Sequence, residues 1–339
     1  MTKQKSRVLK GAAILSMLML HLFCRKANLP YTPLLWVGGT PLIYYFGLFG
    51  DVCVAMFCFI SGYAHELQFE KAVPGRERWK HLLKFLISFW VIAIMTAVTG
   101  MIIRDERIPG SLEEFLLNFF AIRNSYNGAW WYVNTYILLI LLQPLSCQLV
   151  RRLPAWLAGL FAFAFYTVGY GIRFFGWGAS SLSVLSWAIM RVGLLGTSYF
   201  PYLIGMLFAK NNILNLLYKK TINMNHACLY VVSIAVVVGM LVFHAFVQSL
   251  YIAAFTAIAI ISILCVLPLP TWIERGLAYL GVHSGNIWLV HMFFYANLFE
   301  GFVFRAKYPV LIFLLLLALS LAVSYVVNWL SRPIQKLVR

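Results

Sequence analysis

Charged residues are scarce in this chain: Asp, Glu, Lys and Arg together make up 11% of 339 residues, against roughly 25% in soluble domains. Hydrophobic residues make up 62%, which is more apolar side chain than one water-soluble core can bury. The shortage of charge therefore excludes a soluble enzyme. The aromatic content of 17% excludes a disordered chain, and a polytopic membrane protein remains.

The short motifs of soluble catalysis are also missing. The chain contains no phosphate-binding glycine-rich loop, no Gly-x-Ser-x-Gly and no His-Glu-x-x-His, so the usual signals for a bound phosphate, a serine nucleophile or zinc are absent. No ligand cluster supports a metal. The cysteines are Cys24, Cys53, Cys58, Cys147, Cys228 and Cys265. Because they show no paired spacing, we expect small buried thiols and no disulfide framework.

Acidic residues are rarer than basic ones, with 10 Asp and Glu against 27 Lys and Arg, a net charge of +17. In a soluble protein this excess would suggest nucleic acid. In a membrane protein it more often marks cytoplasmic loops that face anionic lipid. We therefore expect the lipid bilayer and no nucleic acid as partner, with a basic ligand site as a second use of the charge.

Long apolar runs are what the chain has in abundance. They are continuous, whereas the strands of a membrane barrel would alternate apolar and polar residues, so they predict helices. The expected spans are 9–25, 42–65, 82–103, 129–149, 154–172, 184–208, 227–243, 246–267, 277–299 and 309–330. The sequence thus predicts an all-α polytopic transmembrane bundle of about ten helices, forming a single membrane-embedded domain over residues 1–339.

The distribution of Lys and Arg orients the bundle. Most of them fall in the segments that lie inside if the N-terminus is cytoplasmic, which places both termini in the cytoplasm.

No small-x-small site follows the first apolar run, so we expect it to be kept as a span and not cleaved. In the long outer loop 104–128, the sequence from Ser111 to Glu114 is typical of a capping box and predicts a short amphipathic helix at the outer interface.

His21 and Lys10 lie eleven residues apart in the first span. This spacing is about 16 Å along a helix and close to three turns, so both side chains fall on nearly one face. Burial disfavours a charged imidazole, and a neutral His21 can serve as base or nucleophile. The alternative is that His21 lies at the outer interface beside Arg25 and Lys26 while Lys10 anchors the helix.

A basic cluster stands at the cytoplasmic entrance of the third span. It consists of Arg78, Lys80, His81 and Lys84. The cluster can bind a phosphate-rich ligand through charge-assisted hydrogen bonds. The commoner use of such a cluster is an anchor on anionic lipid.

The fourth span opens with tryptophans and carries amides. Trp130, Trp131, Asn134 and Tyr136 offer the flat apolar faces and hydrogen-bonding groups that suit a sugar at a cavity mouth. An interfacial aromatic belt with interhelical hydrogen bonds explains them equally. A charge inside the sixth span, Arg191, should face a cavity or a partner.

Other polar residues in the spans are interpreted as structural hydrogen-bonding groups. These are Ser61, Tyr63, Asn286, His283 and His291, while the partner of Asp51 is left open.

Several stretches follow one another in an order that matches a known pattern. They are Lys10 to His21, Val54-Ala-Met-Phe-Cys-Phe-Ile-Ser-Gly-Tyr63, Trp131-Tyr-Val-Asn-Thr-Tyr136 with Pro144, Phe200-Pro-Tyr-Leu-Ile-Gly-Met206, His283-Ser-Gly-Asn-Ile-Trp-Leu-Val-His291, and Ser331-Arg-Pro333. Each stretch alone is a weak signal. Together, over nearly the whole chain, they resemble the integral-membrane acyltransferase family 3, the bacterial O-acetyltransferases of cell-envelope glycans.

One stretch departs from that family. Where its members often have Arg-x-x-Arg at the start of the third helix, this chain has His81-Leu-Leu-Lys84 after Lys80. A positive site survives there without the bidentate phosphate binding of arginine.

The resemblance implies an enzyme, an O-acetyltransferase in a bacterial inner membrane. Acetyl-CoA would be the acyl donor and dock its phosphates on the inside basic cluster. His21 would be the acyl carrier or the general base, and Lys10 would steady the donor or the developing oxyanion. A glycan hydroxyl, the acceptor, would approach from outside near Trp130 and Trp131. The alternative function is a transporter or flippase of a lipid-linked sugar or an anionic solute.

Overall fold

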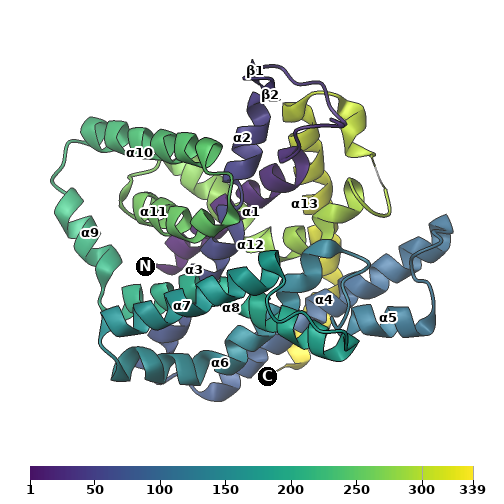
Figure 1. Cartoon of the computed structure of the whole chain (residues 1–339), viewed down its shortest axis with the longest axis horizontal. Coiled ribbons are helices and arrows are strands. Elements are labelled where there is room, and N and C mark those ends of the chain that lie inside the picture. The colour runs from purple at the N-terminus through teal and green to yellow at the C-terminus, as the bar shows by residue number, and fades with distance from the viewer. Residues whose placement is uncertain (300, 339) are drawn as a thin grey trace. The chain divides into compact units, whose positions relative to one another are not determined.

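A computed structural model describes residues 1–299 and 301–338, and Figure 1 shows the arrangement of its helices. The α-helices are α1 (Lys3–Phe23), α2 (Leu42–Phe49), α3 (Val52–Glu70), α4 (Gly75–Ile103), α5 (Leu112–Phe119), α6 (Trp131–Arg152), α7 (Ala155–Phe175), α8 (Ser183–Lys210), α9 (Ile213–Thr221), α10 (His226–Phe246), α11 (Ala253–Val266), α12 (Thr271–Val290) and α13 (Pro309–Leu337). Short 3-10 turns are η1 (Gly128–Trp130), η2 (Leu250–Ile252), η3 (His291–Phe294) and η4 (Val303–Ala306). The strands β1 (Trp36–Val37) and β2 (Thr40–Pro41) pair antiparallel, with Trp36 opposite Pro41.

The predicted all-α membrane fold is confirmed. Eight helical segments of the described residues are long and apolar enough to cross a bilayer. The other two predicted spans correspond to α11, which with η2 forms a shorter apolar helix, and to α12. Helix α12 carries Glu274 and Arg275 near its start and His283 and Asn286 further along, so its average apolarity is lower.

Several boundaries differ from the predicted ones. Residues 244 and 245 were expected to form the turn between the seventh and eighth spans, but His244 lies in the last turn of α10 and the connection is at residues 247–249. The second span is broken at Gly50 and Asp51 into α2 and α3. Helix α13 continues beyond residue 330 to Leu337, because the charged end that follows the apolar run is itself helical.

The described chain divides into two compact units that are interleaved in sequence. Unit 1 comprises Met1–Leu20, Tyr45–Val73 and Leu141–Val282; unit 2 comprises His21–Tyr44, Pro74–Ile140 and His283–Arg339. Sequence reasoning expected one domain over 1–339. Helices α1, α2, α6 and α12 each contribute residues to both units.

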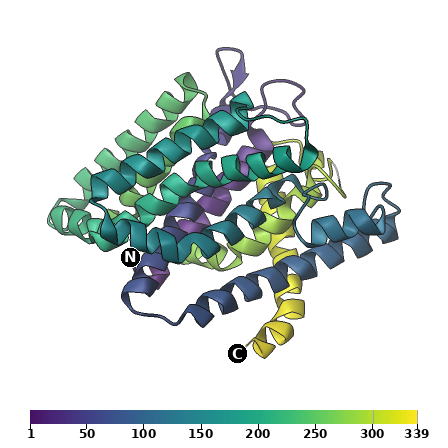
Figure 2. The same cartoon turned by 60° about the horizontal axis from the view of Figure 1, so that its bottom comes forward.

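Unit 1 is built on close packing of α8 against α3 and α7. Helices α7 and α8 run side by side in Figures 1 and 2. A Cβ on Gly62 of α3 would lie 1.9 Å from the carbonyl oxygen of Tyr202, and one on Gly205 of α8 would lie 2.1 Å from that of Phe59. Two glycines thus allow the backbones of α3 and α8 to touch, as small residues do in membrane helices.

Unit 2 has an aromatic core. Its buried members are Phe89, Ile92, Ala93, Ile108, Ala121, Tyr126, Trp130, Val133, Leu289, Val290, Phe293 and Val327. They come from α4, α6, α12, α13 and the outer loop. Helix α13 (yellow) crosses α4 (blue) in Figure 2, where Gln335 donates to the Lys84 carbonyl and to Ser88 Oγ, both at 2.9 Å.

The outer loop 104–128 contains the predicted short helix, α5. The Ser111 hydroxyl accepts from the backbone N–H of Glu114 at 3.1 Å, which is the first half of a capping box. The Glu114 carboxylate instead accepts hydrogen bonds from Ser125, Asn118 and Arg123, and these bonds hold its pKa below the usual range, with the Ser125 bond the largest cause.

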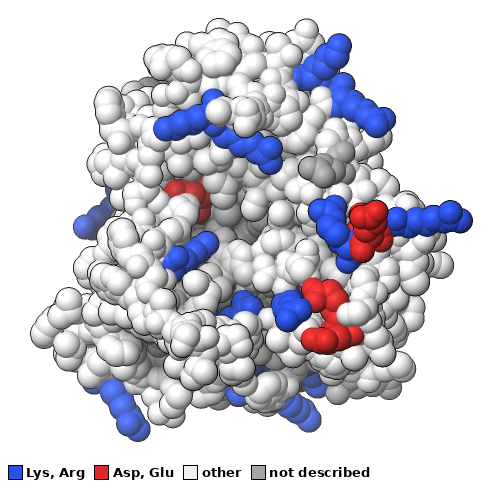
Figure 3. Space-filling model, turned by 45° about the vertical axis from the view of Figure 1, so that its right-hand side comes forward, with Lys and Arg blue, Asp and Glu red and all other residues white. Residues whose placement is uncertain are grey.

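The surface is mostly uncharged. On the face shown in Figure 3, Lys and Arg form a few small groups, some of them beside Asp and Glu. A large white surface of this kind is what lipid contact requires.

Candidate functional site

The last turn of α1 brings His21 against a second histidine. The ring of His21 lies 4.9 Å from that of His291, centroid to centroid, and 6.4 Å from that of Tyr295. The rings of His291 and Tyr295 are 6.1 Å apart. All three residues belong to unit 2. The imidazole singled out in the sequence therefore lies in a small polar aromatic cluster.

His291 is fully buried and has a defined tautomer. Its Nδ1 lies 2.8 Å from the carbonyl oxygen of Trp288. A carbonyl only accepts, so Nδ1 carries the proton and Nε2 has the free lone pair. That Nε2 is buried and has no hydrogen-bond partner among the described residues. The cluster thus contains a neutral imidazole with an unshared lone pair.

Hydrogen bonds to the end of α12 fix the start of η3, the turn that begins with His291. Asn127 Nδ2 and Trp130 Nε1 both donate to the Leu289 carbonyl at 2.9 Å, and Trp288 Nε1 donates to the Ala129 carbonyl at 3.2 Å. The last carbonyls of a helix lack internal partners. Side chains from the outer loop supply them here, so α12 can end at Val290 directly before His291.

The tryptophans at the start of α6 have different roles from each other. Trp130 is 1% exposed and packs on Phe89 and Phe293 at centroid distances of 4.9 and 5.9 Å. This position suits a residue that fixes the end of α12 better than one that touches a ligand. Trp131 is half-buried beside Tyr132.

The two polar residues that follow on α6 are both half-buried. Asn134 Nδ2 donates to the carbonyl of Ala121 in the outer loop. The ring of Tyr136 lies 5.1 Å from Phe85 and 6.4 Å from Tyr132. Tyr132 contacts Trp288 at 5.4 Å, which connects this aromatic face to the helix that carries His291.

Lys10 and Arg191 belong to unit 1, whereas His21 and the four residues of the α6 region belong to unit 2. Lys10 shares the uninterrupted helix α1 with His21, as the spacing predicted. The Arg191 guanidinium lies 5.0 Å from the ring centroid of Trp187, one turn earlier on α8. A partner for this intramembrane charge was expected, and the Trp187 ring provides a cation–π contact.

The basic cluster lies in the first turns of α4. Lys80 donates to Glu77 at 2.7 Å, so its charge is partly engaged. Arg78 is half-buried against the Trp79 ring, while His81 and Lys84 are exposed. Arg78 Nε is buried and has no hydrogen-bond partner among the described residues. Unit 2 also contains Arg332 and Lys336 of α13. Sequence reasoning had not associated these two cations with the basic cluster of α4.

Further polar side chains of α12 make the expected interhelical hydrogen bonds. His283 Nδ1 lies 2.8 Å from Ser324 Oγ, and Asn286 Nδ2 donates to Ser324 and to Asn328 Oδ1 at 3.1 Å. These bonds join α12 to α13 inside unit 2.

Asp51 lies near His244 in unit 1, without a hydrogen bond to it among the described residues. Its Oδ1 lies 3.8 Å from His244 Nδ1, and His244 Nε2 lies 2.8 Å from Thr256 Oγ1. Both the Asp51 and His244 side chains are almost fully buried. Nothing in the sequence pattern indicated this pair, because the two residues are far apart in the chain.

The match to a known family decides the class of the protein. The model of a family described as an acyltransferase domain matches residues 5–329. This chain belongs to that acyltransferase family. No curated protein and no solved structure matches it.

Membership makes the chain a multi-pass membrane acyltransferase, and it favours this class over the transporter. Among residues 1–299 and 301–338, no group of three or more His, Cys, Asp or Glu could hold a metal ion. In the described residues of this acyltransferase, the His21–His291 cluster brings an imidazole with a free lone pair against a second imidazole. Such a pair can carry an acyl group on one ring and accept a proton on the other.

Sequence reasoning did not single out Tyr295, a member of this cluster, or Trp288, whose carbonyl accepts from His291. Neither residue carries a signal of its own, since aromatic residues are common in every span. His291 was interpreted as a structural hydrogen-bonding group, and its Nδ1 makes such a bond. Its contact with His21 comes in addition and was not predicted.

Proposed function

We propose that this acyltransferase moves an acetyl group from cytoplasmic acetyl-CoA to a hydroxyl of an extracytoplasmic or lipid-linked glycan. The contact between His21 and His291, with the free Nε2 of His291, carries the proposal. The proposed setting is a bacterial cell membrane, as the resemblance implies. We propose that both termini lie in the cytoplasm, and the placement of Lys and Arg supports this orientation.

Two routes use the same pair of rings. In the covalent route, a nitrogen of His21 attacks the thioester carbonyl, the C–S bond breaks and the thiolate leaves with a proton as CoA-SH. The glycan oxygen then attacks the acyl-imidazole, the C–N bond breaks, and the hydroxyl proton passes to an imidazole nitrogen. In the direct route, His21 takes the hydroxyl proton while the oxygen attacks the thioester carbonyl, the C–S bond breaks, and the thiolate takes that proton from His21 to leave as CoA-SH. In both routes we propose His291 Nε2 as the second proton acceptor of the pair.

The outer loop and α6 provide the proposed acceptor side. Trp131, Tyr136 and Asn134 offer ring faces and an amide next to the Trp288 face, a combination that suits a sugar. Trp130 acts from the core by holding the Leu289 carbonyl. Lys10 and Arg191 retain their proposed roles as cations for the donor or the acceptor.

Consumption of labelled acetyl-CoA by the purified protein in proteoliposomes tests the proposal. We expect His21→Ala to lower turnover by a factor of about 100 or more, the usual effect of losing a catalytic acid–base group. His226→Ala is the matched control, because His226 is an exposed histidine at the first residue of α10. Label retained on the native protein favours the covalent route. Equal turnover in native protein and His21→Ala, or none in either with a panel of oligosaccharides, contradicts the proposal.

A further inference from the structure

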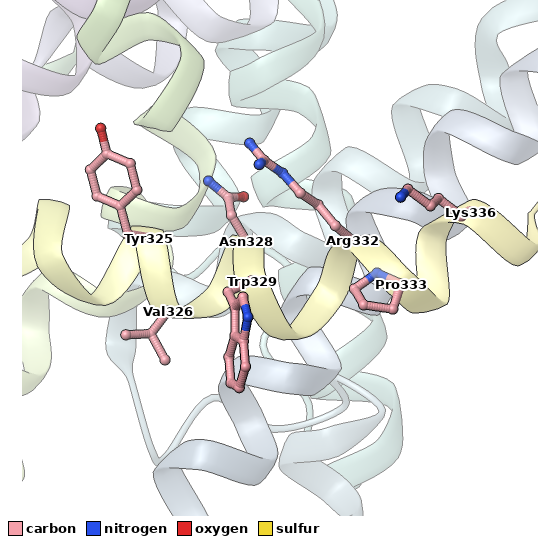
Figure 4. A pocket seen from close by; sticks show the side chains of 7 residues that line it. All are labelled: Tyr325, Val326, Asn328, Trp329, Arg332, Pro333 and Lys336. Carbon is pink, nitrogen blue, oxygen red and sulfur yellow. The ribbon is translucent and has the colours of Figure 1, made fainter.

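The charged end of α13 borders a cavity. Its volume is about 620 Å³, and it is lined by Tyr325, Val326, Asn328, Trp329, Arg332, Pro333 and Lys336. We call this cavity the α13 groove. Tyr325, Asn328, Arg332 and Lys336 project to the same side of the helix in Figure 4. All seven residues lie within unit 2.

The groove carries positive charge that no acidic side chain neutralises. Arg332 and Lys336 stand one helical turn apart and are both exposed. No ion pair joins either of them to an Asp or Glu within residues 1–299 and 301–338. An arginine and a lysine in this arrangement suit a phosphate or diphosphate, through bidentate and point-charge contacts respectively.

Aromatic and amide groups lie beside these cations. Tyr325 is 54% exposed and Asn328 projects near Arg332, both on the same side of α13 in Figure 4, whereas Trp329 is 74% exposed and projects to the other side. An aromatic face stacks on any nucleobase, and an amide can both donate to and accept from a base edge. The groove therefore combines the groups needed for the two halves of a nucleotide.

The groove is connected to both regions already assigned within unit 2. Gln335 joins the charged end of α13 to the carbonyl of Lys84 in the basic cluster of α4. At the other end, Asn328 accepts from Asn286 of α12. His291 follows Asn286 by five residues, about 7–8 Å along the helix axis. The groove therefore borders the helix that leads to His291.

We propose that the α13 groove binds the phosphorylated adenine-nucleotide end of the acyl-CoA donor. Arg332 and Lys336 hold its phosphates, and Tyr325, which projects to the same side of α13, packs on its base. The inference rests on the proposed function and assigns the donor to a helix other than the one singled out in the sequence. The phosphate of an anionic lipid headgroup shares part of this chemistry, and the test separates the two sources.

Equilibrium binding of unacylated CoA to the full-length protein in nanodiscs tests the groove. In pure phosphatidylcholine, which carries no net charge, we expect Arg332→Gln/Lys336→Gln to raise the Kd for CoA about 100-fold or more, because the charged hydrogen bonds of both cations to its phosphates are lost. Lys219→Gln/Lys220→Gln is the control, because it removes the same charge from the exposed end of α9. Tyr325→Ala should also weaken CoA binding, whereas Tyr218→Ala, which removes a similarly exposed tyrosine (46%) of α9, should not.

Three outcomes would overturn the proposed CoA site in the α13 groove. One is native CoA affinity in Arg332→Gln/Lys336→Gln. Another is an equal loss in the control pair, which would indicate general charge attraction. The third is unchanged CoA binding with loss of bound phosphatidylglycerol in mass spectra from anionic nanodiscs, which would assign the groove to lipid. If Arg332→Gln/Lys336→Gln keeps native CoA affinity and native turnover, the proposed CoA site in the groove is wrong but the proposed function is not. Absence of both CoA binding and turnover in the native protein overturns the proposed function as well.

Discussion

At the scale of single residues, the tautomer of His291 is the observation with the most chemical content. Its Nδ1–H is used by the Trp288 carbonyl, so Nε2 is left as the reactive atom. His291→Asn keeps an N–H near the position of Nδ1 and removes Nε2. We expect it to preserve CoA affinity and folding and to lower turnover by about 10²–10⁴. Steady-state kinetics at saturating acetyl-CoA measures this effect, and native turnover in His291→Asn would show that Nε2 takes no part.

A second residue-scale prediction concerns the ion pair between α3 and α6 of unit 1. Arg151 contacts Glu66 Oε1 through Nε and Nη2 at 3.0 and 2.9 Å, while the Glu66 side chain is 1% exposed. Arg151→Gln leaves a buried carboxylate without its cation, which costs about 3–5 kcal/mol. Thermal unfolding in detergent should show a much lower Tm than for Arg152→Gln, the exposed neighbour on the same helix. Equal Tm values would mean that the pair adds nothing.

The sequence was informative about single residues where spacing along one helix carries the geometry. His21 could be singled out because an imidazole in an apolar run costs free energy and needs a reason. Tyr295, Arg332 and Lys336 could not be joined to the site, because their neighbours come from helices far away in the chain. The role of Trp130 could not be predicted either, because its neighbours come from distant parts of the chain. A tryptophan in an interfacial belt and a buried tryptophan that fixes a helix end look identical in the sequence.

At the scale of elements, the contact between α3 and α8 depends on two glycines. Gly62→Ala would place a Cβ within 1.9 Å of a backbone oxygen, and a backbone cannot move aside as a flexible side chain can. We expect Gly62→Ala to unfold at lower temperature or to fail to fold. Gly239→Ala in α10 is the control, since nothing lies within 4 Å of its Cβ and alanine favours the helix. A native Tm for Gly62→Ala would contradict the close approach of the two backbones.

The outer loop provides a pH prediction, with the sign set by Glu114. Its pKa is lowered by bonds from Ser125, Arg123 and Asn118, so the unfolded loop binds a proton more readily than the folded one. The stabilisation is therefore fully present above the ordinary carboxyl range and lost as the pH falls through the lowered pKa. We expect Glu114→Gln to make the loop accessible to trypsin at neutral pH, at Arg123 first. Native resistance in Glu114→Gln would show that the carboxylate does not order the loop.

Helices were the most predictable elements, and their ends the least. Continuous apolar runs specify a span whatever its neighbours are. The ends depend on tertiary partners: α12 stops at Val290 because Asn127 and Trp130 cap its carbonyls, and α13 continues to Leu337 alongside α4. Such partners come from other segments of the chain, so the local sequence of a helix cannot indicate where the helix ends.

At the scale of the whole molecule, both regions argued for the donor and the chemistry belong to unit 2. The α13 groove, the start of α4 and the His21–His291 cluster all lie in residues 21–44, 74–140 and 283–339. Unit 1 holds Lys10, Arg191 and the Asp51–His244 pair. The family match over residues 5–329 spans the two units together.

The central claim is that the acyltransferase moves an acyl group from a donor on the face of its termini to a hydroxyl on the other face, through His21. Proteoliposomes of one orientation test it directly. Labelled acetyl-CoA is supplied on the C-terminal face and a panel of oligosaccharides on the opposite face. The account predicts labelled sugar on the opposite face, and loss of that product in His21→Ala but not in His226→Ala. Product formed only when donor and sugar share one face, or native transfer by His21→Ala, would contradict it.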